Sequence, residues 1–332
     1  MTRFGATILD AEGLRLSAEE KAFFRDANPF GFILFARNID TPDQVRALCE
    51  DMRESVGRDA PITVDQEGGR VQRLRGPVWT EWTPPLDFVK AVGASASQAM
   101  YLRYRLIAAE LLAVGIDSNC APMLDVAGAE THPFLRNRCY GSDPGTIAVL
   151  GRAAADGMLA GGVLPVMKHI PGHGRSTLDT HFELPLVTAA RAALSGTDFA
   201  PFRELSDLPM GMTAHLVFSG IDDRPATLSP VMMQVIRDDI GFDGLLMTDD
   251  LGMKALQGER ADLAARALKA GCDVVLHCNA PLAERCAVAE AAGEMSDAAQ
   301  ARAERALAAR RQPDDIDIPA LQAQLGTLLN GA

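Results

Sequence analysis

Three of the six histidines of the chain lie in one short segment, KHIPGHGRSTLDTH, which runs from Lys168 to His181. Asp179 stands two residues before His181, and in an extended segment residues i and i+2 project to the same side. The carboxylate can therefore accept a hydrogen bond from the Nδ1–H group of the imidazole and raise the basicity of Nε2. The spacing predicts an acid/base unit, with a chance pair in a surface loop as the alternative. The glycines and the missing apolar pattern of residues 172–179 predict a mobile loop with few burial contacts.

The same histidines could instead bind a metal ion. Zinc sites of barrel hydrolases often use H-x-H at the end of the first strand, but here that strand ends in LDAEG without a histidine. His169 and His173 are four residues apart, yet Pro171 and Gly172 between them prevent the helix that would place both rings on one face. We therefore expect no metal ion and no other cofactor. For His169, which ends an apolar segment, burial in the core is a further alternative.

A second segment, GLLMTDDLGM, places two carboxylates directly after an apolar run. A carboxylate at the end of such a strand, Asp249 or Asp250, could act as a nucleophile. One of the two is expected to cap the next helix instead, and we assign that role to Asp250.

A third segment, VDQEGGRVQRL, combines a sharp turn with charged side chains. Gly68 and Gly69 turn the chain. Asp65, Arg70 and Arg73 supply charged hydrogen-bonding groups, which suit a ligand rich in hydroxyl groups.

The elements that must position these residues alternate regularly between apolar, β-branched segments and helical patterns. Asp43 to Val56 has an apolar stripe, Ser229-Pro230 is a helix start, and the helix over 261–270 ends before Gly271. The eight candidate strands are ATILDAEG, GFILFARN, PITVDQEGG, GIDSNCAPMLDV, GVLPVMKHIPGHG, MGMTAHLVF, GLLMTDDLGM and CDVVLHCNA.

Eight strand-helix units in a chain of this length predict an α/β fold with parallel strands, a single closed (β/α)8 TIM-type barrel. An open doubly wound sheet is the alternative, but no G-x-G-x-x-G opens a helix to bind a dinucleotide. No low-complexity linker divides the chain. We therefore expect one catalytic barrel domain over 1–332, with a helical segment 296–332 packed on it.

In a barrel of this type, the residues that end each strand meet at one mouth. One polar residue there is usually structural, but several from different strands predict a functional site. The polar strand ends are Asp65, Glu67, Asp125, Lys168, His169, His215, Asp249 and Asp250.

Composition excludes several other classes. A net charge of −12 argues against nucleic acid, which binds to basic surfaces. The N-terminal apolar run is broken by Asp10 and Glu12, and no apolar run approaches the length of a membrane span, so we expect neither a signal peptide nor a membrane partner. Six cysteines without a C-x-x-C pair indicate reduced thiols in a cytoplasmic protein. We expect a monomer.

Taken together, VDQEGGRVQRL, KHIPGHGRSTLDTH and MTDDLGM resemble the signature segments of the single-domain β-N-acetylglucosaminidases of glycoside hydrolase family three. The resemblance extends from LDAEG to CDVVLHCN. It implies that Asp249 is the nucleophile and that His181, paired with Asp179, is the acid/base. The sugar contacts that it implies are Asp65, Arg73, Arg138, Lys168 and His169, with Arg136 as the alternative to Arg138.

The resemblance also implies a reaction and a small carbohydrate substrate. The reaction would be retaining hydrolysis that removes non-reducing terminal GlcNAc from muropeptides of the GlcNAc-1,6-anhydroMurNAc type, in peptidoglycan recycling. A β-glucosidase or a glycoside phosphorylase on the same scaffold is one alternative. A barrel that binds sugar without catalysis is the alternative from another class.

Overall fold

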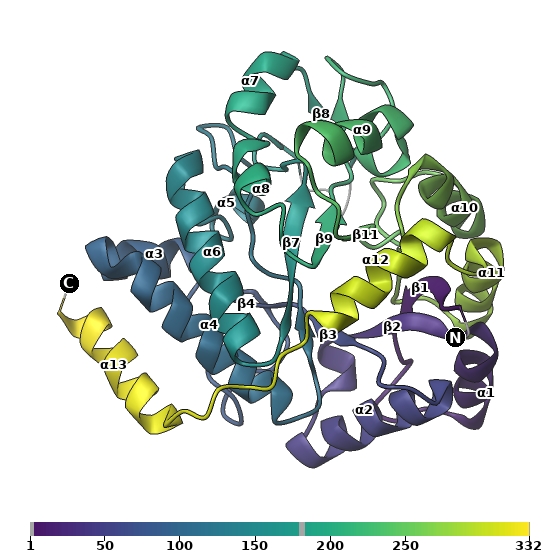
Figure 1. The fold of residues 1–332 in the computed structure, drawn as a ribbon, viewed down its shortest axis with the longest axis horizontal. Coiled ribbons are helices and arrows are strands. Elements are labelled where there is room, and N and C mark those ends of the chain that lie inside the picture. The colour runs from purple at the N-terminus through teal and green to yellow at the C-terminus, as the bar shows by residue number, and fades with distance from the viewer. Residues whose placement is uncertain (1–2, 179–182, 332) are drawn as a thin grey trace.

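The computed structural model describes residues 3–178 and 183–331, and it has the architecture of a barrel ringed by helices (Figure 1). Each of the eight predicted segments contributes one barrel strand. The strands are β1 (Gly5–Leu9), β2 (Pro29–Leu34), β3 (Ile62–Val64), β6 (Ser118–Asn119), β7 (Leu164–Ile170), β9 (Met210–Thr213), β11 (Leu245–Met247) and β12 (Val275–His277).

The strands form one ring in chain order, with all neighbours parallel. β12 pairs with β1, and a parallel bridge between Met247 and Val274 links β11 to β12. The prediction of a (β/α)8 barrel is therefore confirmed. The open doubly wound sheet is excluded, because such a sheet has two free edges.

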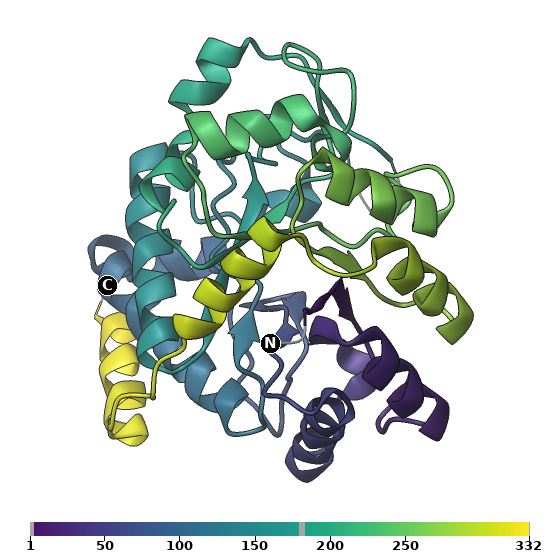
Figure 2. The same ribbon diagram turned by 45° about the vertical axis from the view of Figure 1, so that its right-hand side comes forward.

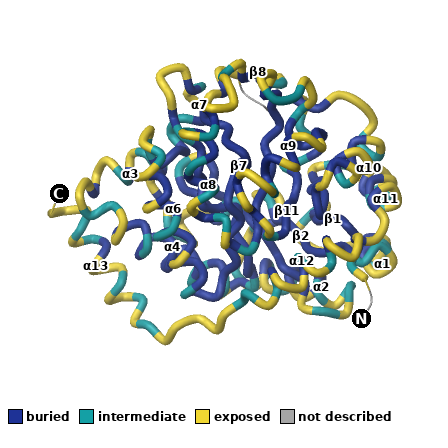
Figure 3. The backbone as a smooth tube through the Cα atoms, turned by 45° about the horizontal axis from the view of Figure 1, so that its top comes forward, coloured by how far each residue is buried: buried dark blue, intermediate teal, exposed yellow. Residues whose placement is uncertain are grey.

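Helices surround the ring on its outer side (Figures 1 and 2). They are α1 (Ala18–Ala27), α2 (Pro42–Val56), α3 (Pro85–Val92), α4 (Ala96–Leu112), α5 (Pro133–Arg136), α6 (Pro144–Ala160), α7 (Arg191–Gly196), α8 (Ala200–Glu204), α9 (Pro230–Gln234), α10 (Arg260–Ala270), α11 (Leu282–Ala292), α12 (Asp297–Ala308) and α13 (Ile318–Asn330). In Figure 3 the barrel strands at the centre are buried, and the exposed residues lie on the outward faces of the helices and on the loops.

Local signals explain where the predicted helices begin and end. The Thr41 hydroxyl accepts the Gln44 N–H at the start of α2, and Gly57 ends that helix with a φ of 63°. The Ser229 hydroxyl accepts the Met232 N–H at the start of α9. Gly271, with a φ of 126°, ends α10.

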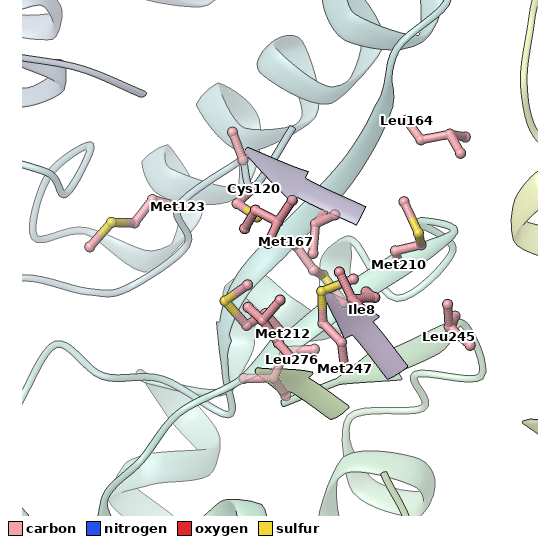
Figure 4. Packing of buried hydrophobic residues seen from close by; sticks show 14 of the residues in the cluster. Ile8, Cys120, Met123, Leu164, Met167, Met210, Met212, Leu245, Met247 and Leu276 are labelled. Atoms are coloured by element: carbon pink, nitrogen blue, oxygen red, sulfur yellow. The ribbon is translucent and has the colours of Figure 1, made fainter. Parts of the chain in front are cut away.

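The interior of the ring is filled by apolar side chains from the strands (Figure 4). Methionines are prominent among them: Met167, Met210, Met212 and Met247 are all buried. Their unbranched side chains suit irregular gaps between larger neighbours. All six cysteines are free thiols, as expected.

The C-terminal helices pack on the barrel at two places. α12 packs against β11, and Arg302 joins it to the barrel through Asp243 at 2.9 Å and Asp273 at 3.0 Å. α13 lies against α3 and α4, away from the strands (Figure 1).

Two small sheets were not predicted. β4 (Gln66–Gly68) and β5 (Val71–Gln72) form an antiparallel hairpin after β3, and β8 (Leu186–Val187) pairs with β10 (Val217–Phe218). Gly68 in the hairpin has a φ of 112°, and a Cβ there would lie 2.0 Å from the Arg103 guanidinium. Only glycine fits at this point of the turn.

None of the helices within 3–178 and 183–331 is long and apolar enough to cross a lipid bilayer.

Candidate active site

A cavity of about 250 Å³ lies where the carboxyl ends of the strands meet. Its lining consists of Ile33, Phe35, Asp65, Arg70, Val71, Arg73, Phe134, Arg138, Lys168, His169, His173, Met212, Asp249, Asp250, Met253, Leu276 and Asn279. All the predicted site residues that the structure describes are in this set. Four larger hollows, of about 770, 990, 890 and 550 Å³, contain none of them.

Asp65, directly after β3, is held between two cations. Its Oδ1 lies 2.8 Å from Lys168 Nζ, and its Oδ2 lies 3.0 Å from an Arg73 Nη. Burial alone would raise the pKa of Asp65, but Lys168 and Arg73 outweigh it and hold that pKa well below its ordinary value. The site therefore contains a fixed carboxylate that accepts hydrogen bonds.

Glu67 lies behind the cavity and joins two of its cations. Arg138 donates to both carboxylate oxygens, at 2.8 and 3.0 Å, and Lys168 Nζ lies 2.5 Å from Oε1. Glu67 is 1% exposed; burial favours its neutral form, yet Arg138 and Lys168 lower its pKa to about 2. From the sequence, Glu67 is expected to be one of the polar strand ends, but no role is assigned to it. The structure shows it as the shared partner of two cavity residues.

Arg138, and not Arg136, reaches the cavity. Arg136 donates to the carbonyl oxygens of Gly128 and Ala129, at 2.7 and 2.5 Å, and so holds the preceding loop. The choice of Arg138 as the candidate sugar contact is consistent with this geometry.

Asp249 follows β11 after one residue and lines the cavity. Its Oδ1 accepts the N–H of Asp250 at 2.8 Å. Burial opposes ionisation, but His215 and His169 outweigh it and keep the pKa of Asp249 below its ordinary value. An ionised carboxylate at this position is chemically competent as a nucleophile.

His215 fixes the main chain beside Asp249. Its Nε2 lies 3.1 Å from the carbonyl oxygen of Asp250, so Nε2 carries the proton, and Nδ1 lies 2.8 Å from the Thr227 hydroxyl. Burial lowers the pKa of His215, and the neighbouring Asp249 carboxylate opposes this effect. The sequence listed His215 only as a polar strand end.

Asp250 does not cap a helix, contrary to the sequence prediction. Its Oδ1 accepts the N–H groups of Gly252 and Cys278, at 2.9 and 3.3 Å, while the next helix, α10, begins only at Arg260. Burial raises its pKa to about 6. The carboxylate stabilises a turn and the neighbouring strand end.

Asp125, His169 and His173 form a buried cluster, named here the Asp125 cluster. The His169 Nδ1 lies 2.7 Å from Asp125 Oδ2, and Asp125 Oδ1 accepts the His173 N–H at 2.6 Å. These bonds, with burial opposing them, keep the pKa of Asp125 below its ordinary value. His169 is buried, as the core alternative supposed, but it also lines the cavity.

The Asp125 cluster shows that His169 and His173 lie close together, contrary to the expectation from the sequence. The rings of His169 and His173 are 5.3 Å apart, and one ligand atom from each of the three residues lies within 4.8 Å of the others. The Pro171-Gly172 break therefore does not keep the two histidines apart, because the chain folds back without a helix. The break at Pro171 and Gly172 therefore no longer supports the prediction that the enzyme needs no metal ion. That statement stays a prediction.

The loop after β7 is also more firmly packed than expected over its first half. Gly172, His173, Gly174 and Ser176 are buried, and a Cβ on Gly174 would lie 1.9 Å from the Val126 carbonyl oxygen. The expectation of few burial contacts is wrong for these residues. Asp179 and His181, the predicted acid/base pair, lie outside the described residues.

Comparisons with known proteins identify the family of the chain. Residues 6–309 match the family described as "Glycosyl hydrolase family 3 N terminal domain". The chain is 40% identical over 285 residues to a protein of Alkalilimnicola ehrlichii named beta-hexosaminidase, covering 83% of this chain and 81% of the relative. It is 39% identical over 280 residues to the beta-hexosaminidase of Methylococcus capsulatus, covering 82% and 83%.

A solved structure shows the same likeness over the whole barrel. NagZ from Neisseria gonorrhoeae, in complex with N-trifluoroacetyl-D-glucosamine, superposes with a TM-score of 0.84 at 29% identity, covering 99% of this chain and 97% of that one. The chain therefore belongs to glycosyl hydrolase family 3, and it is a glycoside hydrolase of the β-N-acetylhexosaminidase type.

Proposed function

We propose that this protein is a retaining exo-β-N-acetylglucosaminidase with Asp249 as nucleophile and His181 as acid/base. The observation that carries the proposal is the position of Asp249, an ionised carboxylate in a small polar cavity. Lys168, Arg138 and Arg73 line the same cavity and supply hydrogen-bond donors. A cavity of about 250 Å³ is at the small end of ligand sites, and it suits one sugar unit of an exo-acting enzyme.

In the first step, an Asp249 oxygen attacks the anomeric carbon of the terminal sugar. The bond from that carbon to the leaving oxygen breaks, and His181 gives its proton to this oxygen. Asp179 would accept a hydrogen bond from Nδ1–H, which orients the imidazole and leaves Nε2 as the nitrogen that gives and takes the catalytic proton. The product is a covalent glycosyl ester of Asp249.

In the second step, His181 takes a proton from a water molecule, and the water oxygen attacks the same carbon. The ester bond breaks, Asp249 returns as a carboxylate, and the sugar leaves with its original β configuration. Two inversions give net retention. The carboxylate-separation rule of two-carboxylate glycosidases does not apply, because the acid/base here is a histidine.

The sugar contacts proposed for the bound GlcNAc are Asp65, Arg73, Arg138, Lys168 and His169. Their network supplies acceptors on Asp65 and donors on the three cations. Hydroxyl groups need both kinds of partner. The name of the Alkalilimnicola relative and the amino-sugar ligand of the Neisseria structure support GlcNAc as the sugar.

The natural substrate that we propose is a muropeptide of the GlcNAc-1,6-anhydroMurNAc type, cleaved in the cytoplasm during peptidoglycan recycling. The enzyme would act as a monomer. This role rests on the family likeness, and the acidic composition with six free thiols is compatible with it.

The test compares the p-nitrophenyl β-glycosides of GlcNAc and glucose, with and without phosphate, and then GlcNAc-1,6-anhydroMurNAc itself. We expect kcat/KM to be highest for the GlcNAc glycosides, and the released GlcNAc to appear first as the β anomer by NMR. A preference for glucose would favour a β-glucosidase, and a sugar phosphate product would favour a phosphorylase. Binding without turnover of any β-glycoside would favour a sugar-binding barrel.

A further inference from the structure

His173 is a buried histidine whose ring has no hydrogen-bond partner among the residues that the structure describes. It is 6% exposed, and neither Nδ1 nor Nε2 has a partner, although the ring lines the cavity. A buried polar group without a partner costs folding free energy, so native structures retain few of them. The ring therefore calls for a partner other than the residues of 3–178 and 183–331.

The backbone holds this ring firmly in place. The N–H of His173 is donated to Asp125 Oδ1 at 2.6 Å. Gly172, with a φ of 134°, lies against Asp198, and a Cβ on Gly174 would meet the Val126 carbonyl. The ring also packs edge-on to His169, with 5.3 Å between the centroids. Because its position is fixed on both sides, the ring cannot turn away to find a protein partner.

Most of the charged side chains that line the cavity offer only donors or only acceptors, whereas a neutral imidazole offers one of each. Lysine and arginine side chains only donate hydrogen bonds, and ionised aspartates only accept them. A neutral imidazole has one donor and one acceptor, and so does each sugar hydroxyl group. Burial, reinforced by the neighbouring His169, lowers the pKa of His173 to about 3, so its ring is neutral at physiological pH.

A metal ion would be the other partner for such a ring. The Asp125 cluster has suitable atoms within 4.8 Å. However, Asp125 Oδ2 is engaged by the His169 ring at 2.7 Å, and Oδ1 by two backbone N–H groups at 2.6 and 3.3 Å. A cation would have to displace bonds that are already formed, whereas a hydroxyl group at His173 displaces none. The contacts favour the hydroxyl group.

We propose that His173 is a further substrate-binding residue, which exchanges hydrogen bonds with a hydroxyl group of the bound sugar. This rests on the proposed function, since it takes the terminal GlcNAc as the occupant of the cavity. In the complex, the sugar hydroxyl group would be the hydrogen-bond partner that the ring does not find among the described residues.

The experiment measures GlcNAc binding by calorimetry and thermal stability for the wild type, His173→Leu and His173→Gln. Leucine cannot form hydrogen bonds, so GlcNAc should bind about 3- to 10-fold more weakly for each bond lost. The Tm of His173→Leu should equal or exceed that of the wild type, because a buried unsatisfied ring has been removed. Glutamine, which has a donor and an acceptor, should restore part of the affinity.

Deoxy analogues of GlcNAc test the contact itself. The wild type should bind one of the 3-, 4- and 6-deoxy sugars more weakly than GlcNAc, and His173→Leu should lose that one discrimination. As matched control, His277→Gln changes a buried histidine outside the cavity, whose Nε2 lies 3.0 Å from Glu284, and it should bind GlcNAc as the wild type does.

Unchanged GlcNAc affinity in both His173 variants would overturn the inference. So would weaker binding with the deoxy discrimination intact, which would indicate a purely structural role. Stoichiometric Zn²⁺ binding that is lost in His173→Leu while GlcNAc binding stays unchanged would assign the ring to a metal instead. These outcomes are distinct from failure of the proposed function, in which the wild type itself hydrolyses no β-GlcNAc glycoside.

Discussion

The substitution Glu67→Gln tests the charge network under the cavity. It removes one negative charge with little change of side-chain shape. The fall of the Glu67 pKa from 4.5 to about 2 corresponds to roughly 3 kcal/mol in favour of the ionised form. Because the side chain is only 1% exposed, solvent screening hardly reduces this figure. We expect the variant to be less stable by about 3 kcal/mol at pH 7, since Arg138 and Lys168 lose a shared partner.

The pH dependence of this loss follows from the direction of the pKa change. The folded-state pKa lies below the unfolded one, so the contribution is present above about pH 4.5 and is lost as the pH falls toward 2. Urea unfolding at pH 7 and at pH 3 should therefore show a large difference between wild type and variant at pH 7 and a smaller one at pH 3.

A matched control is Glu110→Gln, which changes a half-buried carboxylate that accepts hydrogen bonds from the N–H and hydroxyl of Thr80. We expect its cost to be about 1 kcal/mol or less. Two results would refute the reasoning for Glu67: a loss below about 1 kcal/mol at pH 7, or a loss that is equally large at pH 3.

Three further predictions concern the acid/base, metal ions and Asp250. His181→Ala should slow hydrolysis of the natural disaccharide by about 10² to 10⁴. With p-nitrophenyl GlcNAc it should give a burst and a slow steady state that azide accelerates in stopped-flow; equal losses on both substrates without a burst would remove His181 from the mechanism. Dialysis against EDTA should leave kcat unchanged, and a loss restored by Zn²⁺ would contradict this. Asp250→Asn should gain stability relative to the wild type, by up to about 3 kcal/mol, as the pH rises from 4 to 8, because burial raises the pKa of Asp250 to about 6 and its ionised form is disfavoured in the fold. Melting curves that differ equally at both pH values would exclude that explanation.

The barrel could be predicted because its elements depend on local patterns. Each strand is a short apolar run bounded by turn residues, and caps such as Ser229 mark helix starts. The hairpin of β4 and β5 was missed because its residues, Gln66–Gly68 and Val71–Gln72, are mostly polar and form no apolar run. Parallel order then followed from the repeated units and needed no further information.

The sequence could predict which residues belong to the site, but not how these residues contact one another. The rule that strand ends share one mouth placed Asp65, Lys168 and Asp249 together, although they are far apart in the sequence. It could not show that Glu67 turns behind the cavity, since that depends on the Gly68 backbone and its contact with Arg103.

The approach of His169 to His173 was missed for a related reason. It depends on how the loop packs against Asp198 and Val126, and these contacts come from other parts of the chain. Spacing within one segment describes helices and strands well. It does not describe an irregular loop whose path is fixed by distant residues.

The most direct test of the account is to trap the covalent intermediate. A 5-fluoro derivative of GlcNAc with a good leaving group should glycosylate the enzyme faster than the ester hydrolyses, so the ester accumulates. Mass spectrometry of the digested protein should locate one sugar on the peptide that contains Asp249, and Asp249→Ala should take up none. A sugar on Asp250 or on another side chain, or no adduct together with inverted product, would contradict the proposal that Asp249 is the nucleophile.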